Sequence, residues 1–275
     1  MTRRYTPWAL LVVALALAAV YLFPLYWMYV TSLKSGSEIF ANPPTFWPTT
    51  PNPDIYGQVW SRRTMSTFLW NSVIIASGVT AITVILGTGC AYVLARYRSA
   101  WIDVGLFAVL MLQVLPASVM ITPLFVGFNQ IGLLNYPRLA VILAAAAKSM
   151  PFFVVLVRAT FMSVPRELEE AALVDGNSRV GAFFLIVLPL ARNGILVCAI
   201  LTFMGSFGEY IYSKSIIQSP ALQPASVGLS GFLGPNSSDW NSIMAYSAIY
   251  VTPILAIFVI LQRRIVSGLT SGALK

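Results

Sequence analysis

The segment that decides the fold is Pro165–Leu190, PRELEEAALVDGNSRVGAFFLIVLPL. It carries three glutamates, and long apolar runs flank it on both sides. A charged side chain in the middle of a lipid bilayer costs about 3 kcal/mol or more, so such a segment does not lie inside a membrane. We therefore expect a short charged helix in water at the membrane face, joining two membrane spans.

Local signals predict where this helix begins and ends. Pro165 suits the first turn of a helix, where its missing N–H group is not needed. The glutamates of Glu167–Glu170 lie near the positive end of the helix dipole. Asp175-Gly176 predicts the end of the helix, because glycine adopts positive φ easily.

Three residues of the predicted helix share one narrow face. Leu168, Ala171 and Ala172 stand at positions i, i+3 and i+4. A helix of about three turns is not stable alone in water. We expect it to dock on a surface, either its own helix bundle or another protein.

The same residues carry a resemblance to a known family. Glu170-Ala171-Ala172, Asp175-Gly176, Ile186 and Leu188-Pro189 resemble the E-A-A…G…I…L-P signature of membrane permease subunits of binding-protein-dependent ABC importers. The resemblance covers the whole chain, including Asn71-Ser72 at the start of the second span. The ending Gln262–Lys275 is similar to the tail of the maltose-type carbohydrate permeases. This sequence departs from the family pattern at Asn193-Gly194, where many relatives have a second proline after Leu188-Pro189. The bend of the chain into the next span can therefore differ from that of the relatives.

The resemblance implies an all-α membrane protein of the type I ABC importer permease fold, with six transmembrane helices and a cytoplasmic coupling helix. It implies two ATPase subunits, which bind ATP and Mg²⁺, a second and different permease chain, and an extracytoplasmic substrate-binding protein. No cofactor is expected on this chain. An ordinary amphipathic connector is the alternative interpretation of the helix. The residues expected to couple to the ATPase are Glu170, Ala171, Ala172, Asp175, Gly176, Leu188 and Pro189.

Composition independently predicts a multi-pass membrane protein. Hydrophobic residues make up 58% of the 275 residues and charged residues only 9%, which no soluble domain of this length tolerates. We expect a single transmembrane domain over 1–275, with the coupling segment at 165–189. The predicted spans are about 8–30, 68–95, 104–128, 139–161, 190–212 and 243–261.

The basic residues predict the orientation of these spans. With the N-terminus inside, eleven Lys and Arg side chains fall at the inner face and five at the outer face. Both termini and the charged helix are then cytoplasmic, in the cytoplasmic (inner) membrane of a bacterium or archaeon. The inner set is Arg3, Arg4, Arg96, Arg98, Arg158, Arg166, Arg179, Arg192, Arg263, Arg264 and Lys275; the outer set is Lys34, Arg62, Arg63, Arg138 and Lys214.

Several other functions lack the residues they need. The net charge of +8 comes from scattered basic pairs beside apolar spans, so we expect no nucleic-acid partner. Cys90 and Cys198 have no metal or redox spacing, and we expect no metal site. The chain has neither a histidine nor a G-x-x-x-x-G-K-[ST] motif, so we expect it to be no enzyme and to rely on ATP hydrolysis by another chain.

Alternative transport mechanisms remain open on the sequence. An ion-coupled secondary carrier needs buried acidic residues, and the only acids outside the loops and the charged segment are Asp103 and Glu209. A phosphotransferase component or a membrane enzyme needs reactive side chains that the sequence does not provide. An importer for a solute other than a sugar, such as a glycerophosphodiester, has the same layout.

Residues of the substrate pathway are less clearly marked than those of the coupling helix. Gln113 and Pro116 predict either a kink lining the pathway or a bend made for packing. Lys148 interrupts the fourth span, where it either acts directly or extends to the interface. In the maltose-type group the partner permease can hold most of the substrate. The pathway candidates are Gln113, Asn129, Phe207, Glu209 and Tyr210.

Overall fold

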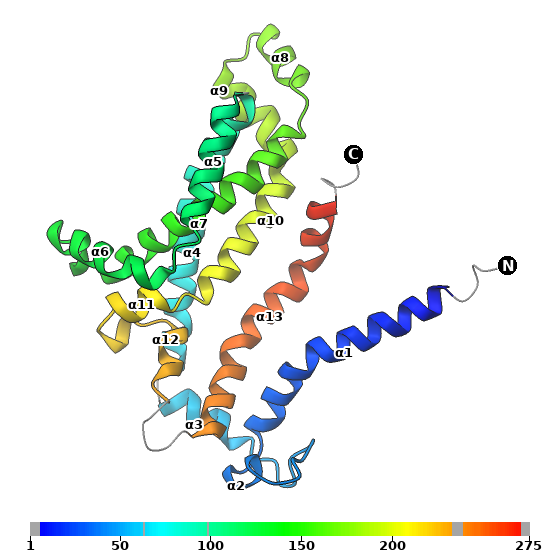
Figure 1. Cartoon of the computed structure of the whole chain (residues 1–275), viewed down its shortest axis with the longest axis vertical. Helices are drawn as coiled ribbons and strands as arrows, with labels where there is room; N and C mark the ends of the chain where they lie inside the picture. The colour runs from blue at the N-terminus through cyan, green and yellow to red at the C-terminus, as the bar shows by residue number, and fades with distance from the viewer. Residues whose placement is uncertain (1–5, 63, 98, 233–238, 271–275) are drawn as a thin grey trace. The chain divides into compact units, whose positions relative to one another are not determined.

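The computed structural model describes residues 6–62, 64–97, 99–232 and 239–270, and within these ranges every regular element is a helix (Figure 1). Five helical stretches are long and apolar enough to cross a membrane, and a sharply bent pair of helices makes six if it counts as one span. The predicted all-α membrane fold is confirmed. The five stretches belong to α1 (Thr6–Ser32), α4 (Met65–Arg96), α7 (Pro137–Met162), the continuous helix Arg179–Phe207 and α13 (Trp240–Thr270).

Some sequence-based expectations fall on residues that the structure leaves undescribed. Arg3, Arg4, Arg63, Arg98 and Lys275 lie outside the described residues, as does the last part of the ending Gln262–Lys275. The orientation inferred from the basic residues therefore stays a prediction.

The third predicted span, about 104–128, is not one straight helix. It consists of α5 (Ala100–Leu112) and α6 (Ala117–Gln130), which meet at an angle of 94°. The proline ring of Pro116 disfavours helical geometry at the preceding residue, so α5 ends before it and α6 begins after it. The predicted interruption at Gln113 and Pro116 is thus a complete break between two helices.

The fifth predicted span, about 190–212, begins earlier and ends earlier than expected. The helix runs without a break through α9 (Arg179–Ala182), a π-helical turn (Phe183–Val187) and α10 (Leu188–Phe207). The wide turn lies just before Leu188-Pro189, where the proline has no N–H to continue the helical ladder. The helix ends at Phe207, so Tyr210–Tyr212 lie beyond it, at the start of α11 (Ile211–Ile216).

Within the chain, the residues group into two compact units, and the predicted single transmembrane domain over 1–275 stays a prediction. Each unit is built from segments far apart in the sequence, which a linear pattern of spans does not reveal. Residues 67–227 and 254–275 form the larger unit; residues 1–66 and 228–253 form the smaller one.

The core of the larger unit lies along α4, α7 and α10. One buried cluster includes Val79 and Val141, and a second includes Phe153, Phe161 and Val187. Glycines allow the helices to approach closely. An added Cβ would come within 2.7 Å of Ile142 at Gly78 and within 2.6 Å of Phe153 at Gly87, whereas Gly89 has no neighbour within 4 Å.

The start of α4 is tied to a loop far away in the sequence. The side-chain amide of Asn71 donates hydrogen bonds to the backbone carbonyls of Ala221 (3.0 Å) and Gln223 (2.9 Å). The Ser72 hydroxyl accepts a hydrogen bond from the backbone N–H of Ala225 at 2.9 Å. These bonds satisfy buried polar groups and fix the entrance of the second span.

The smaller unit is organised around a buried lysine. Lys34, with 2% of its surface exposed, donates a hydrogen bond to the carbonyl of Thr45, and its ammonium lies 4.4 Å from the centre of the Trp27 ring. The side chain of Asn241 donates to the carbonyls of Ser32 and Lys34. The proline-rich segment between 41 and 53 is irregular; α2 (Gly36–Ile39) precedes it and α3 (Asp54–Arg62) follows it.

We predict that Gly194→Val destabilises the larger unit. A Cβ at Gly194 would lie 2.5 Å from two atoms of Thr160, so the new side chain has to push α10 away from α7. Such overpacking costs about 1–3 kcal/mol. Thermal unfolding in detergent should occur at a lower temperature, and Thr160→Ala should restore part of the loss.

Gly89→Val is the matched control, because it makes the same change in a membrane helix at a position with no neighbour within 4 Å. An equal loss of stability in the two variants would contradict the close contact between α7 and α10.

Candidate functional site

The charged segment forms a separate short helix, α8 (Glu167–Val174) (Figure 1). The sequence predicts Pro165 in the first turn of this helix. The helix begins after Arg166, however, so Pro165 precedes it. Its end is as predicted: Gly176 has φ +90°, the N–H of Gly176 bonds to the carbonyl of Leu173, and the N–H of Asn177 bonds to that of Ala172. This pair of bonds is the Schellman motif, in which a left-handed residue closes the helix.

The face predicted from Leu168, Ala171 and Ala172 does not exist as one surface. Ala172 is buried, with 3% of its surface exposed, whereas Leu168 is 44% exposed and Ala171 is also exposed. Ala172 and Glu169 share the inward face, because they stand three residues apart on the helix. Ala172 therefore packs within its own chain and is not available to a partner.

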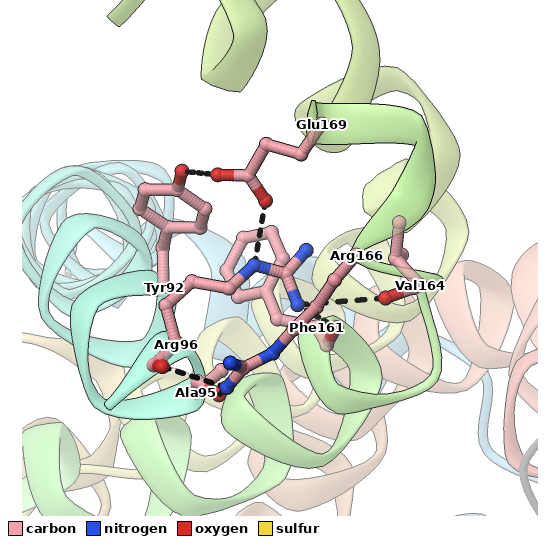
Figure 2. A network of polar contacts seen from close by, with 7 residues as sticks. All are labelled: Tyr92, Ala95, Arg96, Phe161, Val164, Arg166 and Glu169. Carbon is pink, nitrogen blue, oxygen red and sulfur yellow. Dashed lines mark hydrogen bonds and ion pairs between the residues drawn. The ribbon is translucent and has the colours of Figure 1, made fainter. Parts of the chain in front are cut away.

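An ion pair holds α8 against the end of α4 (Figure 2). Arg96 donates a hydrogen bond through Nε to Oε2 of Glu169 at 2.7 Å, and the Tyr92 hydroxyl donates to Oε1 of the same carboxylate. The two charged side chains are only 13% and 14% exposed. At this low exposure an ion pair with matched hydrogen bonds is screened less than a pair on an open surface.

Two arginines extend this contact to the loop between α7 and α8 (Figure 2). Arg96 donates through Nη1 to the carbonyls of Phe161 (3.2 Å) and Val164 (3.4 Å). Arg166 donates through Nη2 to the carbonyl of Arg96 at 2.6 Å. Arg166 thus binds the carbonyl of the last residue of α4, and Arg96 binds one carbonyl at the end of α7 and one just after it, where the helix dipole favours positive charge. We call Tyr92, Arg96, Arg166 and Glu169 the coupling brace.

The other predicted coupling residues are divided between two places. Glu170, Ala171, Asp175 and Gly176 are exposed on α8 and at its end. Leu188-Pro189 lies in the following helix, where Leu188 packs against the core and Pro189 is exposed. Among the described residues, Glu167 and Glu170 make no hydrogen bond or ion pair through their carboxylates. The outward surface of α8 is thus acidic and unpaired.

Sequence reasoning did not assign the coupling brace. Glu169 looked equivalent to its two neighbouring glutamates, and Arg96 was interpreted only as a marker of the inner membrane face. The available signal was the spacing of Glu169 and Ala172, which places a carboxylate on the same side of the helix as a small residue.

A second candidate site is a cavity of about 630 Å³ in the larger unit. Its wall includes Gln113, Glu209 and Tyr210, three of the predicted pathway residues, together with Lys148. The other two lie elsewhere: Asn129 is exposed at the end of α6, and Phe207 is buried beside Phe203.

Two interrupted helices border this cavity. Gln113 stands at the break between α5 and α6 and donates a hydrogen bond to the carbonyl of Lys148 at 3.2 Å. Glu209 stands at the break between α10 and α11, where its carboxylate accepts hydrogen bonds from the N–H groups of Tyr212 (2.7 Å) and Ser213 (2.8 Å). In transporters, interrupted helices near the middle of the membrane commonly form the substrate site. Within the described residues no three His, Cys, Asp or Glu side chains form a metal site.

The profile of the family described as "Binding-protein-dependent transport system inner membrane component" matches residues 83–271. This range contains α8, the interrupted helices and the helix that begins at Arg179. The chain belongs to this family. It is therefore a multi-pass permease of the inner membrane, which confirms the predicted importer permease.

Full-length relatives agree with the family match. A sulfoquinovosyl glycerol transport permease of Agrobacterium fabrum is 34% identical over 92% of this chain and 89% of its own. A trehalose transport permease of Mycobacterium tuberculosis is 33% identical, covering 99% of this chain and 98% of its own. A trehalose/maltose permease of Thermococcus litoralis is 31% identical, with 97% and 96% covered.

A solved structure shows the same fold. The permease resembles a chain of a bacterial ABC transporter involved in the import of the acidic polysaccharide alginate, with a TM-score of 0.77. The match covers 96% of this chain and 98% of that chain at 19% sequence identity.

We predict that Glu169→Gln loosens α8 while the permease stays folded. The substitution removes the charge that pairs with Arg96, which leaves a poorly exposed guanidinium without its anion. Losing a hydrogen bond to a charged group costs about 1–3 kcal/mol. Backbone hydrogen exchange should become about tenfold faster or more over 167–174 and stay unchanged in α10.

Glu167→Gln is the control in the same helix, because its carboxylate is exposed and unpaired among the described residues. If the two variants exchange at the same rate over 167–174, the coupling brace does not hold α8.

Proposed function

We propose that this permease forms half of the membrane pathway of an ATP-driven importer for a carbohydrate. The observation that carries the proposal is α8, an eight-residue helix braced to its own bundle through Glu169 and presenting an exposed Glu170 that pairs with none of the described residues. Relatives whose names specify trehalose, trehalose/maltose or diacetylchitobiose support the carbohydrate class. The chain's own role is mechanical and not catalytic.

The proposed mechanism begins at the outward surface of α8. An ATPase subunit docks on this surface and moves it when ATP binds. The coupling brace links α8 to the ends of α4 and α7, so a displacement of α8 reaches two membrane helices as a rigid-body motion. The same α7 lines the cavity at Lys148 and Phe153. Movement at α8 thereby changes access to the cavity.

The proposal includes the partners expected from the sequence. Two ATPase subunits hold ATP and Mg²⁺, a second and different permease chain completes the pathway, and an extracytoplasmic binding protein delivers the substrate. In this proposal both termini and α8 lie in the cytoplasm, where ATP is available, as the distribution of basic residues predicts.

The structure disfavours an ion-coupled carrier. Such a carrier needs an acidic side chain that is free to bind and release an ion. The carboxylate of Glu209 accepts hydrogen bonds at the start of α11, and that of Asp103 pairs with Arg158 at 2.7 Å. Both acids near the span ends are already engaged.

Copurification tests the proposal directly. The tagged permease is expressed with its neighbouring transport genes and extracted in mild detergent. An ATPase should copurify with it, with two ATPase subunits for every two permease chains. An importer without an associated ATPase, or uptake that continues when ATP is depleted and an ion gradient is kept, would refute it.

We predict that Glu170→Lys abolishes uptake and uncouples ATP hydrolysis from delivery of the loaded binding protein. At a desolvated interface, a cation opposite a like charge costs several kcal/mol, whereas the same reversal on a solvated surface costs about 0.5 kcal/mol or less. Uptake and stimulated ATP hydrolysis are measured in reconstituted vesicles.

Glu167→Lys serves as the control, since it reverses an equally exposed carboxylate nearly one turn earlier, and its effect should be mild. If the Glu170→Lys importer assembles and takes up substrate normally, Glu170 does not couple the permease to the ATPase.

A bulky side chain distinguishes the docking surface from the bundle. We predict that Ala171→Trp weakens attachment of the ATPase but leaves the permease stable, because Ala171 is exposed. Ala172→Trp should instead destabilise the permease itself, because Ala172 is buried. Copurified ATPase and thermal stability are measured on the same samples. The opposite assignment of the two effects would contradict the orientation of α8.

A further inference from the structure

Lys148 is a charged residue near the middle of a membrane helix. It is the twelfth of the 26 residues of α7, which places it about 17 Å from one end and about 21 Å from the other at 1.5 Å per residue. Lys148 is therefore far from both ends of the helix. A charge at such a depth is costly unless it serves a function or has a partner.

The ammonium group of Lys148 has no such partner among the residues that the structure describes. No ion pair or hydrogen bond of its Nζ occurs there, although the residue lines the cavity of about 630 Å³. The carboxylate on the same wall, Glu209, is occupied: its oxygens accept hydrogen bonds from two backbone N–H groups and from the Ser213 hydroxyl.

The cavity has a second positive feature. Helix α6 has 14 residues and begins at Ala117, which lies in the cavity wall, and no side chain caps its N-terminus. The first N–H groups of a helix and the positive end of its dipole favour anions. Lys148 and the start of α6 thus contribute positive potential to one cavity.

The remaining wall is suited to the body of a sugar. Phe152 and Tyr210 provide aromatic surface, and Gln113, Ser149 and Thr202 provide groups that form hydrogen bonds. Aromatic rings pack against the apolar faces of sugar rings, while a few polar groups fix orientation.

From these observations we infer that the cavity is a subsite for the anionic group of an acidic glycoside, with Lys148 binding a carboxylate, sulfonate or phosphate carried by the sugar. The inference rests on the proposed function and narrows its substrate class. A bound anion compensates the lysine charge, which has no partner within the described part of the chain, so the permease adds its own charge selection at membrane depth.

Binding of two matched sugars tests this inference. The complex of both permeases with the ATPase is placed in lipid nanodiscs without the binding protein, so that only the membrane site is measured. The probes are methyl β-D-glucuronide and methyl β-D-glucoside, which differ in one carboxylate, and their affinities are compared by saturation-transfer NMR. We expect the glucuronide to bind about tenfold more tightly or better, and less tightly as salt is raised.

Three variants assign the effect to Lys148. Lys148→Gln should remove the preference for the glucuronide, and Lys148→Arg should keep it. Lys214→Gln makes the same charge change outside the cavity and should leave the preference intact.

Other outcomes overturn the inference. One is the absence of any preference for the glucuronide, and another is a preference that survives Lys148→Gln. A third has two parts: the original protein shows no preference for the glucuronide, and the Lys148→Gln complex fails to assemble. This result would mean that a carboxylate of the partner permease neutralises Lys148. The amount of ATPase that copurifies is measured in the same preparations. Absence of the ATPase would refute the proposed importer function, and this result is independent of the sugar-binding result.

Discussion

The pairing of Glu169 with Arg96 is the interaction that holds α8 against the rest of this permease. An eight-residue helix rich in glutamate has neither the length nor the apolar face to stay folded by itself. The structure solves this by turning one carboxylate inward, onto an arginine at the end of a membrane helix, and by using the same arginine to bind the carbonyls of Phe161 in α7 and Val164 just after it. Two helix ends and a loop are thereby joined by one guanidinium group.

This arrangement separates two tasks that the sequence presents together. Glu167, Glu169 and Glu170 are near neighbours, but a helix turns by about 100° per residue, so they face different directions. Glu169 serves internal stability, and Glu170 remains exposed on the surface that we propose contacts the ATPase. The helix α7 then connects this end of the protein with the cavity, since Lys148 and Phe161 are 13 residues, or about 20 Å, apart on one helix.

Much of the fold could be predicted from the sequence, because membrane spans and helix ends have strong local signals. The apolar runs, the positive φ at Gly176 and the interruption near Pro116 all follow from local chemistry. Contacts between distant segments could not be predicted in the same way. The spacing of Glu169 and Ala172 puts them on one side of the helix, but nothing local shows that this side faces inward. Nor does anything local show that the helix at Arg179 continues through Leu188-Pro189. These features depend on which surface lies opposite each residue, as does the position of Lys148 beside Gln113.

The central claim is that motion at α8 reaches the cavity through the coupling brace, and thiol labelling in the cavity tests it most directly. With Cys90 and Cys198 replaced by alanine, a single cysteine is placed at Ser149, which lines the cavity. Its labelling by a membrane-impermeant reagent is measured in vesicles, with and without ATP trapped by vanadate. The account predicts that the labelling rate changes when nucleotide is trapped, and that Glu169→Gln greatly reduces this change while the ATPase stays bound. A nucleotide-dependent change of the same size in the Glu169→Gln importer would contradict it.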